Sequence, residues 1–309
     1  MALISDCGLM IEPQLGMGFH DVVGWATYAE KLGYGYFLRS DHLLPTQGNL
    51  ERDSPECWIT LGAVAKSTKR IKFGPMVSPI GFRNPAMLAQ MSCNLHAYSH
   101  GRFILGLGAG WYREEYVRKG FDYPDLKIRH DQLIEALRII RPLTQGKRVE
   151  FEGKHYKANT ICYPYSRNKL RLVLGGWSQF IRRAVNEYAD EWNLWNGVPS
   201  DFKEIGQKIS NDGQAIEISR AGLFFLAESE KKLQRKLKAK SPLLKELNLP
   251  ATLDGLRKNE VLCGDVEEFI VQLKEFKNAG VRRFYFDILD TRDRQMIELL
   301  SSVLKYELK

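Results

Sequence analysis

The chain has 309 residues, ordinary shares of apolar and charged residues, and a formal net charge of +8 at pH 7. This length fits one large domain, such as a (β/α)₈ barrel, or two smaller domains. No run of about eighteen apolar residues is present, so we expect no membrane-spanning helix. The amino terminus has no basic region before an apolar core, so we expect no signal peptide.

The five cysteines are odd in number and widely scattered, and no pair has the spacing of a metal site or a redox motif. We therefore expect a reducing, cytoplasmic setting. A basic protein can bind nucleic acid, an acidic membrane surface or an anionic small ligand. No arginine-rich or aromatic-interleaved motif supports nucleic acid. Much of the positive charge lies in residues 231–245, which we interpret as the solvated face of a helix.

Short apolar strands alternate with amphipathic helices along the chain. Asn84 and Pro85 form a good helix start, because Asn84 can cap and the missing N–H of Pro85 costs nothing at the first helical position. Gly33 and Gly280 end helices, and Ser178 and Asp265 begin them. The expected strands are 9–12, 34–39, 71–77, 103–107, 170–174, 191–195, 221–226 and 283–288. The expected helices are 19–32, one from 54, 86–97, one around 133–140, 178–188, 199–210, one from 265, and 294–304.

Alternation of strands and helices predicts an α/β fold with a parallel sheet, and eight units predict a closed (β/α)₈ TIM barrel. We expect one domain over residues 1–309, with a loop at 112–127, a small β-hairpin at 149–158 and an insertion around 227–260. A doubly wound sheet is the alternative. No GxGxxG motif follows the first strand, which argues against it.

An acidic residue and a histidine, Asp41 and His42, directly follow the second expected strand. Histidine exchanges protons easily near neutral pH, and a neighbouring carboxylate can raise its pKa or hold a ligand. The pair is therefore a candidate catalytic site. A structural interpretation stays open, in which Asp41 caps a turn and His42 packs. The other histidines lie on expected helices, the hairpin or a turn, where we interpret them as structural.

Two glycine-rich turns end strands on the same side of the predicted barrel. Gly108-Ala109-Gly110 lets the backbone approach a ligand closely, and Gly175-Gly176 precedes a helix whose N–H groups and dipole favour a phosphate. Both also fit ordinary tight turns. Trp111 and Trp177 follow these turns and are candidate walls for a flat ligand, although most tryptophans belong to the core. No Walker, HExxH, GxSxG or EF-hand motif is present, and nothing supports a metal.

Several short motifs, in order along the chain, match a known family. They are Ser40-Asp41-His42-Leu43-Leu44-Pro45, Phe82-Arg83-Asn84-Pro85-Ala86 with Gln90, Gly101-Arg102-Phe103, Gly106-Leu107-Gly108-Ala109-Gly110-Trp111 with Glu115-Tyr116, Phe151-Glu152-Gly153-Lys154-His155-Tyr156, Leu174-Gly175-Gly176 and Tyr188-Ala189-Asp190-Glu191-Trp192-Asn193. Through them the chain resembles the bacterial-luciferase-like flavin and deazaflavin enzymes, most of all their coenzyme F420-dependent branch. The match covers most of the chain and implies a (β/α)₈ barrel with insertions.

The resemblance implies a cofactor, coenzyme F420 or alternatively FMN, across the carboxyl ends of the strands. Its phosphate would lie at Gly175 and Gly176, and the backbone of Gly108-Ala109-Gly110 would approach it. A non-proline cis peptide at Met76–Val77, to within one residue, would support the back of the ring system, together with Ser78.

By the same resemblance, His42 donates or accepts a proton and Asp41 binds or polarises the cofactor. The implied reaction is hydride transfer between the deazaflavin and a carbonyl, alcohol, imine or activated alkene. Some deazaflavin dehydrogenases carry a carboxylate directly after the glycine turn, where this chain has Trp111, and Glu114 and Glu115 follow only later. A sugar-phosphate substrate is therefore not implied, and Trp111 and Trp177 are candidates for shaping a substrate pocket.

Two other functions stay open. One is an FMN-dependent two-component monooxygenase, which would use O₂ and a flavin reductase partner. The other is a non-catalytic flavin-binding protein on the same barrel. The Asp41-His42 pair favours the deazaflavin oxidoreductase. We expect a small-molecule substrate and no nucleic-acid or membrane partner, and a homodimer is compatible with the resemblance because members often dimerise through barrel helices.

Overall fold

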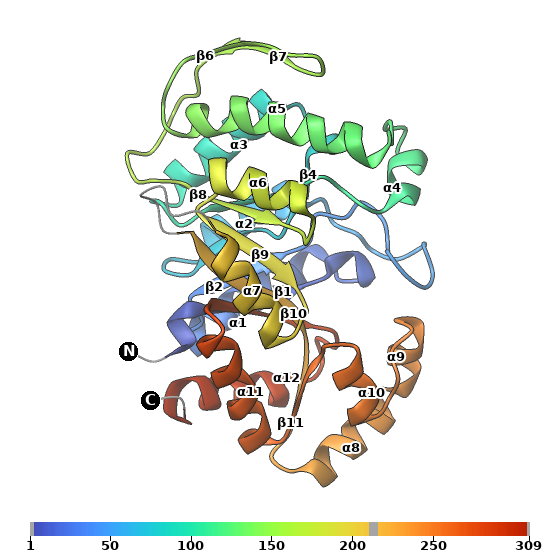
Figure 1. Ribbon diagram of the computed structural model, residues 1–309. Coiled ribbons are helices and arrows are strands. Elements are labelled where there is room, and N and C mark those ends of the chain that lie inside the picture. Colours follow the sequence, from blue (N-terminus) through green and yellow to red (C-terminus); the bar gives the residue numbers. More distant parts are fainter. Residues whose placement is uncertain (1–2, 210–215, 308–309) are drawn as a thin grey trace.

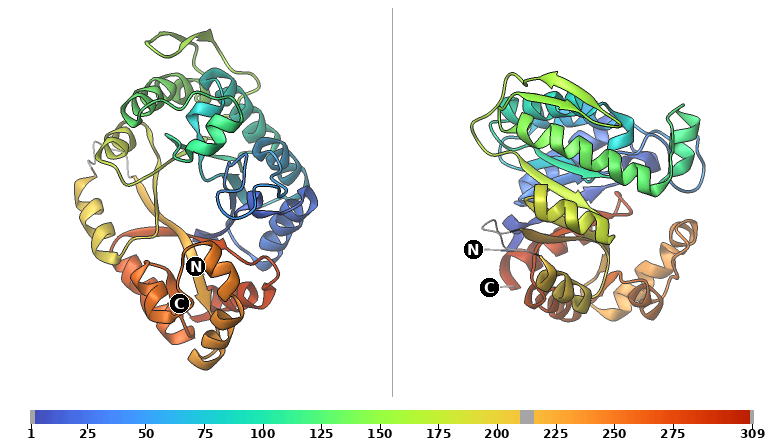
Figure 2. Two further views of the ribbon diagram at one scale, coloured as in Figure 1. Left: turned by 90° about the vertical axis from the view of Figure 1, so that its right-hand side faces the viewer. Right: turned by 45° about the horizontal axis from the view of Figure 1, so that its top comes forward.

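A mostly parallel sheet curves into a barrel whose outside is covered by helices (Figure 1, Figure 2). The computed structural model describes residues 3–209 and 216–307. The barrel strands follow the order β3-β2-β1-β12-β10-β9-β8-β5, and a parallel bridge between Phe73 and Phe103 joins the two ends of this row. In the described part of the chain, the predicted (β/α)₈ TIM-barrel architecture is therefore confirmed.

The barrel strands lie close to their predicted positions. They are β1 (Cys7–Ile11), β2 (Tyr36–Arg39), β3 (Lys72–Pro75), β5 (Ile104–Gly108), β8 (Arg171–Gly175), β9 (Glu191–Trp195), β10 (Glu217–Leu226) and β12 (Val281–Ile288). Two short parallel strands extend the sheet, β4 (Ser78–Pro79) beside β5 and β11 (Leu262–Gly264) beside β10, and neither was predicted. The predicted hairpin is formed by the antiparallel strands β6 (Val149–Glu152) and β7 (Lys157–Thr160), which stand apart from the barrel at the top of Figure 1.

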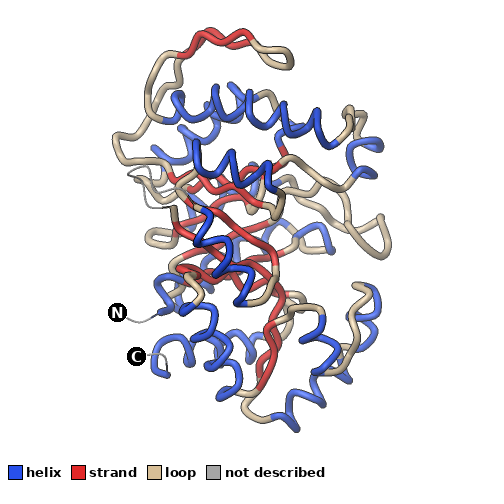
Figure 3. Tube along the Cα trace, in the orientation of Figure 1, coloured by secondary structure: helices blue, strands red, loops and turns tan. Residues whose placement is uncertain are grey.

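The helices that alternate with the barrel strands form the outer layer (Figure 3). They are α1 (Phe19–Leu32), α2 (Cys57–Ser67), α3 (Pro85–Tyr98), α4 (Arg113–Arg118), α5 (Leu126–Thr144), α6 (Gln179–Tyr188), α7 (Pro199–Lys208), α8 (Glu230–Ala239), α9 (Ser241–Glu246), α10 (Leu253–Lys258), α11 (Val266–Asn278) and α12 (Arg294–Ser302). Four further single turns are η1 (Leu3–Asp6), η2 (Pro13–Leu15), η3 (Ile80–Phe82) and η4 (Val303–Glu307).

Capping residues begin these helices where the sequence predicts. The Asn84 side chain accepts hydrogen bonds from the first turn of α3, and the Ser178 and Asp265 side chains do the same for α6 and α11. Each bond satisfies a backbone N–H that has no partner within its helix. The predicted helix 199–210 ends as α7 at Lys208, and its last residue lies outside the described residues.

The expected loop at 112–127 is wrong in part, because α4 lies within it. This short helix follows β5 and lies on the right-hand side of Figure 1, at the end of the barrel where the parallel strands finish. The helices α8, α9 and α10, between β10 and β11, lie toward the same side. Carboxyl ends of parallel strands are where barrel proteins build their sites.

Charged and phenolic side chains fill the opposite, amino-terminal end of the barrel interior. Glu191 is fully buried and accepts hydrogen bonds from Arg171 at 3.0 Å and from the Tyr285 hydroxyl at 2.7 Å. Arg283 bonds Glu217 and Tyr36. A mutually paired network of this kind satisfies buried charges. It closes this end and leaves the other end for ligands.

The basic segment 231–245 is only partly the solvated face that the sequence predicts. Lys231 and Lys238 on α8 are exposed. Lys236 instead pairs with Asp293 at 2.9 Å, and Lys240 with Asp290 at 2.6 Å. These carboxylates follow β12, so the two lysines tie the segment to the barrel.

Within the described residues, no helix combines the length and the apolar composition needed to cross a bilayer.

Candidate active site

The loop that follows β2 contains the predicted Asp41 and His42, and their side chains have different surroundings. The Asp41 carboxylate is buried. Its Oδ2 accepts hydrogen bonds from Arg83 Nη1 at 2.6 Å, Ser78 Oγ at 2.5 Å and Trp58 Nε1 at 3.3 Å. Arg83 Nη2 also donates to Oδ1 at 3.2 Å, which makes the pair two-pronged. Asp41 therefore fixes the loop after β2 to the start of β4 and to Arg83.

His42 pairs with a carboxylate other than its sequence neighbour. Its Nδ1 lies 2.9 Å from Oε1 and 3.2 Å from Oε2 of Glu115 on α4. The backbone N–H of Leu43 donates to the same carboxylate at 2.9 Å. Because an ionised carboxylate only accepts, Nδ1 must carry the proton. Nε2 has no hydrogen-bond partner among the described residues, which leaves it available to a ligand.

The surroundings of His42 shift its pKa in two directions. Burial alone would lower the pKa, because it disfavours the charged ring. The hydrogen bond and charge of Glu115, assisted by the charges of Glu12 and Asp41, outweigh burial and raise the pKa above its ordinary value. Histidine is the side chain that most easily holds and releases a proton under physiological conditions.

Two aromatic rings flank His42. Trp111 meets the imidazole edge to face, with ring centroids 5.6 Å apart, and Tyr112 does so at 6.2 Å. Trp111 is 64% exposed. This agrees with the prediction that Trp111 borders a substrate, which stays a prediction.

The peptide bond between Met76 and Val77 is cis, at the position that the resemblance implies. The Val77 side chain explains two nearby glycines. A Cβ atom on Gly108 would lie 2.8 Å from Val77 Cγ2, and one on Gly175 would lie 3.1 Å from Cγ1. Protein packing at Val77 is thus sufficient reason for glycine there, and the predicted cofactor contacts of these residues stay predictions.

Gly110 has a similar packing reason. Its φ is +80°, and a Cβ atom would lie 2.1 Å from the hydroxyl of Tyr116 on α4. That hydroxyl is buried and lacks a hydrogen-bond partner in the described structure. Glycine at 110 therefore lets α4 approach β5, which carries Glu115 to His42. Ala109, between the two glycines, packs against the core.

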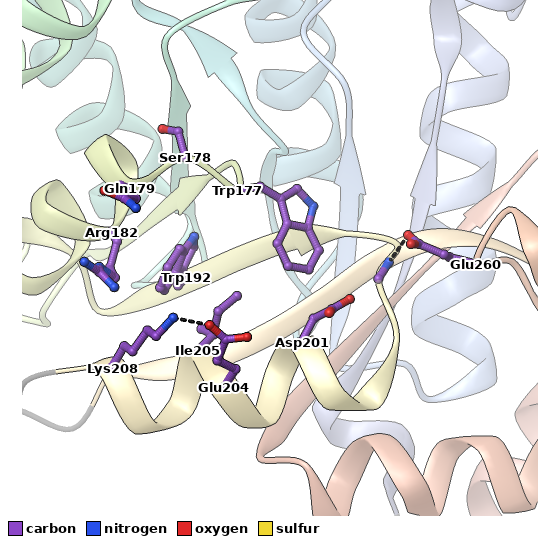
Figure 4. Close-up of a pocket in the computed structure, with 11 residues that line it drawn as sticks. Trp177, Ser178, Gln179, Arg182, Trp192, Asp201, Glu204, Ile205, Lys208 and Glu260 are labelled. Carbon is purple, nitrogen blue, oxygen red and sulfur yellow. Dashed lines mark hydrogen bonds and ion pairs between the residues drawn. The ribbon is translucent and has the colours of Figure 1, made fainter.

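The turn Gly175-Gly176 leads into α6 as predicted. The Gly176 N–H donates to the backbone of β9, and the Ser178 hydroxyl caps the helix at 3.2 Å. Beside this helix start lies a cavity of about 450 Å³ between α6 and α7 (Figure 4). Trp177, Ser178, Gln179 and Arg182 line one side of it.

Trp177 belongs to this cavity between α6 and α7. Its indole N–H donates to the Trp195 carbonyl oxygen at 2.9 Å, and its ring packs edge to face on Phe202 of α7. Trp111, in contrast, contacts His42. The lining of the cavity includes neither Asp41 nor His42. The two tryptophans predicted to shape one pocket therefore lie in two different environments.

Sequence reasoning did not assign roles to Glu115 and Arg83, although both lie in the motifs of the resemblance. We interpreted Tyr112–Lys127 as a loop, so the carboxylate of Glu115 was not expected to reach the site. A buried Glu in a short helix just after a barrel strand was the available signal.

Among the described residues, no group of three or more His, Cys, Asp or Glu could hold a metal ion.

Comparisons with known proteins identify the family of the chain. A curated relative in Amycolatopsis mediterranei, named F420-dependent glucose-6-phosphate dehydrogenase, is 25% identical over 298 residues, 87% of this chain and 88% of that one.

Two solved structures share the fold. One is an F420-dependent secondary alcohol dehydrogenase in complex with an F420-acetone adduct, with a TM-score of 0.82, 21% identity and coverage of 96% and 97%. The other is the oxygenating constituent of 3,6-diketocamphane monooxygenase from Pseudomonas putida in complex with FMN, with a TM-score of 0.77, 20% identity and coverage of 100% and 99%. A family model described as luciferase-like monooxygenase matches residues 6–283, and the chain belongs to that family.

Proposed function

We propose that the chain is a coenzyme F420-dependent oxidoreductase that transfers a hydride between the deazaflavin and a small organic substrate. The substrate would be a carbonyl compound or alcohol, an imine or an activated alkene. The observation that carries the proposal is the His42–Glu115 pair, which keeps Nε2 of His42 free at the carboxyl ends of the strands. The name of the relative from Amycolatopsis mediterranei supports the choice of cofactor.

The residues beside α6 fit a cofactor that carries a phosphate. The helix amino terminus offers N–H groups and a positive dipole end. Arg182, one turn into α6, lines the adjacent cavity and has no carboxylate partner among the described residues. A cation without a partner beside a helix start is suited to an anionic group.

When bound, the deazaflavin supplies a two-electron hydride carrier. The role of the protein's own residues is to move the proton that accompanies the hydride. Glu115 holds the Nδ1 proton of His42, so Nε2 can take the proton of an alcohol or give one to a carbonyl oxygen. The charge of Glu115 also favours the protonated ring that forms when Nε2 accepts a proton.

An FMN-dependent monooxygenase is the second candidate, because the solved FMN complex shares this fold. Both cofactors carry a phosphate, so the α6 terminus suits both. The proton-handling pair His42–Glu115 favours hydride transfer coupled to proton transfer.

Titration of the purified apoprotein with oxidised coenzyme F420 and, separately, with FMN tests the proposal, with cofactor fluorescence as the readout. We expect saturable binding of coenzyme F420 and weaker binding of FMN. Tight binding of FMN without any response to the deazaflavin would overturn the choice of cofactor.

A further inference from the structure

A second carboxylic acid occupies the site end of the barrel interior. Asp287 lies at the carboxyl end of β12 and is 3% exposed. Its neighbours Phe286 and Ile288 pack outward against the helices, whereas Tyr285 belongs to the cluster inside the barrel. Because side chains alternate along a strand, Asp287 faces the interior. Its Oδ1 has no hydrogen-bond partner in the described residues.

The strands on both sides of Asp287 give it apolar neighbours. Its register partner on β1 is Met10, and that on β10 is Leu223. The acid whose charge acts on Asp287 is Glu12, which follows β1. Asp290, three residues further along the chain, is paired with Lys240. Burial, followed by the charge of Glu12, raises the pKa of Asp287 well above its ordinary value. No cation from β1, β10 or β12 offsets this.

Glu12 is linked toward the His42 side of the site. Gln14 donates to the Glu12 carboxylate, and the Ser40 hydroxyl donates to Gln14 Oε1 at 2.7 Å. Gln14 and Ser40 are both buried, and Ser40 directly precedes Asp41. The chain of hydrogen bonds therefore connects the carboxyl ends of β1 and β2. Asp287 and His42 lie on either side of it.

We propose that Asp287 is a neutral carboxylic acid that donates a hydrogen bond to the oxygen of an uncharged substrate, a carbonyl or a hydroxyl. The unpartnered Oδ1 in an apolar setting is the kind of donor that a bound oxygen completes. Glu12 beside it would repel a carboxylate or phosphate on the substrate. Arg83, which follows β4, is already paired with Asp41 and Glu56. This inference deepens the proposed function and rests on it.

The protonation of Asp287 can be tested on the apoprotein. If the folded state keeps a proton that the unfolded chain has released, the contribution of Asp287 to the stability of the wild type falls as pH rises above about 3.9. Asp287→Leu should then melt at a higher temperature than the wild type at pH 7, with a gap that narrows toward acid pH. Its infrared spectrum should lack one carbonyl band of a protonated acid. Asp122→Asn, at an exposed position, is the control and should change neither.

The hydrogen bond can be tested by steady-state kinetics with coenzyme F420 and a panel of secondary alcohols and ketones. Asp287→Leu removes the donor and should lower kcat/KM by about tenfold to a hundredfold. Asp287→Asn keeps an N–H donor and should stay within about threefold of the wild type. Equal activity of the Leu variant and the wild type would overturn the proposal, as would equal losses in both variants.

Different results would contradict the proposed function and the role of Asp287. A wild type that binds no deazaflavin, or oxidises and reduces no member of the panel, contradicts the proposed function, while the apoprotein measurements still report on Asp287. A wild type that turns over, combined with a pH-independent stability gap between it and Asp287→Leu, contradicts only the inference about Asp287.

Discussion

The Nδ1 atom of His42 lies 2.9 Å from Oε1 of Glu115, and the Glu115 side chain is almost completely buried. His42 follows the carboxyl end of β2 and Glu115 follows the carboxyl end of β5, and the two residues are 73 positions apart in the chain. A buried carboxylate fixed in this way sets both the orientation of the imidazole and the nitrogen that remains reactive. The pair has the form of a proton-transfer unit whose base is held ready by its partner.

Replacing Glu115 should change how activity depends on pH. In Glu115→Gln, burial still lowers the pKa of His42 but the main contribution that raises it is gone. The ring should therefore lose its proton at lower pH. The acidic limb of the pH profile for alcohol oxidation, which requires a neutral base, should shift to lower pH, with kcat lower by about tenfold or more. Glu114→Gln, next along α4 and paired with exposed Arg118, is the matched control. If the acidic limb of the pH profile did not shift in Glu115→Gln, Glu115 would not be the group that raises the pKa of His42.

Arg83 should be important for stability because Asp41 is buried. Arg83→Leu leaves the Asp41 carboxylate with only the Ser78 and Trp58 donors and no countercharge. Removing one partner of a buried pair costs about 3–5 kcal/mol. The urea unfolding midpoint should fall accordingly. Arg118→Leu breaks an exposed pair and should cost less than about 1 kcal/mol. Similar losses in both variants would show that Asp41 is less dependent on Arg83 than its geometry indicates.

Asp190 gives a second pH-dependent prediction. Burial alone would raise its pKa, but Arg141, Lys169 and the Leu172 N–H together lower it. A lowered pKa in the folded state adds stability that is present above the unfolded value of about 3.9 and is lost as pH falls through the folded value.

Asp190→Asn should therefore lose about 1–3 kcal/mol of unfolding free energy at pH 7 and progressively less below pH 4. Urea titrations at several pH values measure this difference. Asp131→Asn on α5 is the control. A loss for Asp190→Asn that does not depend on pH would mean that shape, not charge, carries the effect.

Arg182 should contribute to cofactor binding through the phosphate. Arg182→Gln should weaken the affinity for coenzyme F420 by about tenfold, in line with the loss of one charge-assisted hydrogen bond. A deazaflavin analogue that lacks the phosphate should bind the variant and the wild type equally. Arg183→Gln, which alters the exposed neighbour of Arg182, should leave both affinities unchanged. If Arg182→Gln weakened the binding of coenzyme F420 and of the phosphate-free analogue equally, Arg182 would not act through the phosphate.

Local signals predicted most of the barrel. The caps at Asn84, Ser178 and Asp265 and the apolar strands lie where the chain itself indicates, because capping and alternation are local properties. The strand β11 was missed since three residues give too little pattern. The helix α4 was missed because it has fewer than two full turns and lies among loop-forming residues.

The site could be predicted only in part. Asp41 and His42 were identified from their position after β2, but their partners Arg83 and Glu115 come from distant elements. Pairing of this kind depends on the closed barrel and cannot be read from spacing. The same reason explains why Lys236 and Lys240 looked solvated in the sequence although they pair with Asp290 and Asp293.

The most direct test of the account compares His42→Ala with the wild type in cofactor binding and in turnover. Binding is followed by deazaflavin fluorescence, and hydride transfer by the absorbance of the oxidised cofactor, with reduced coenzyme F420 and a panel of ketones, imines and activated alkenes. We expect that His42→Ala binds the cofactor within about tenfold of the wild type and loses turnover. Turnover in His42→Ala equal to that of the wild type would contradict it.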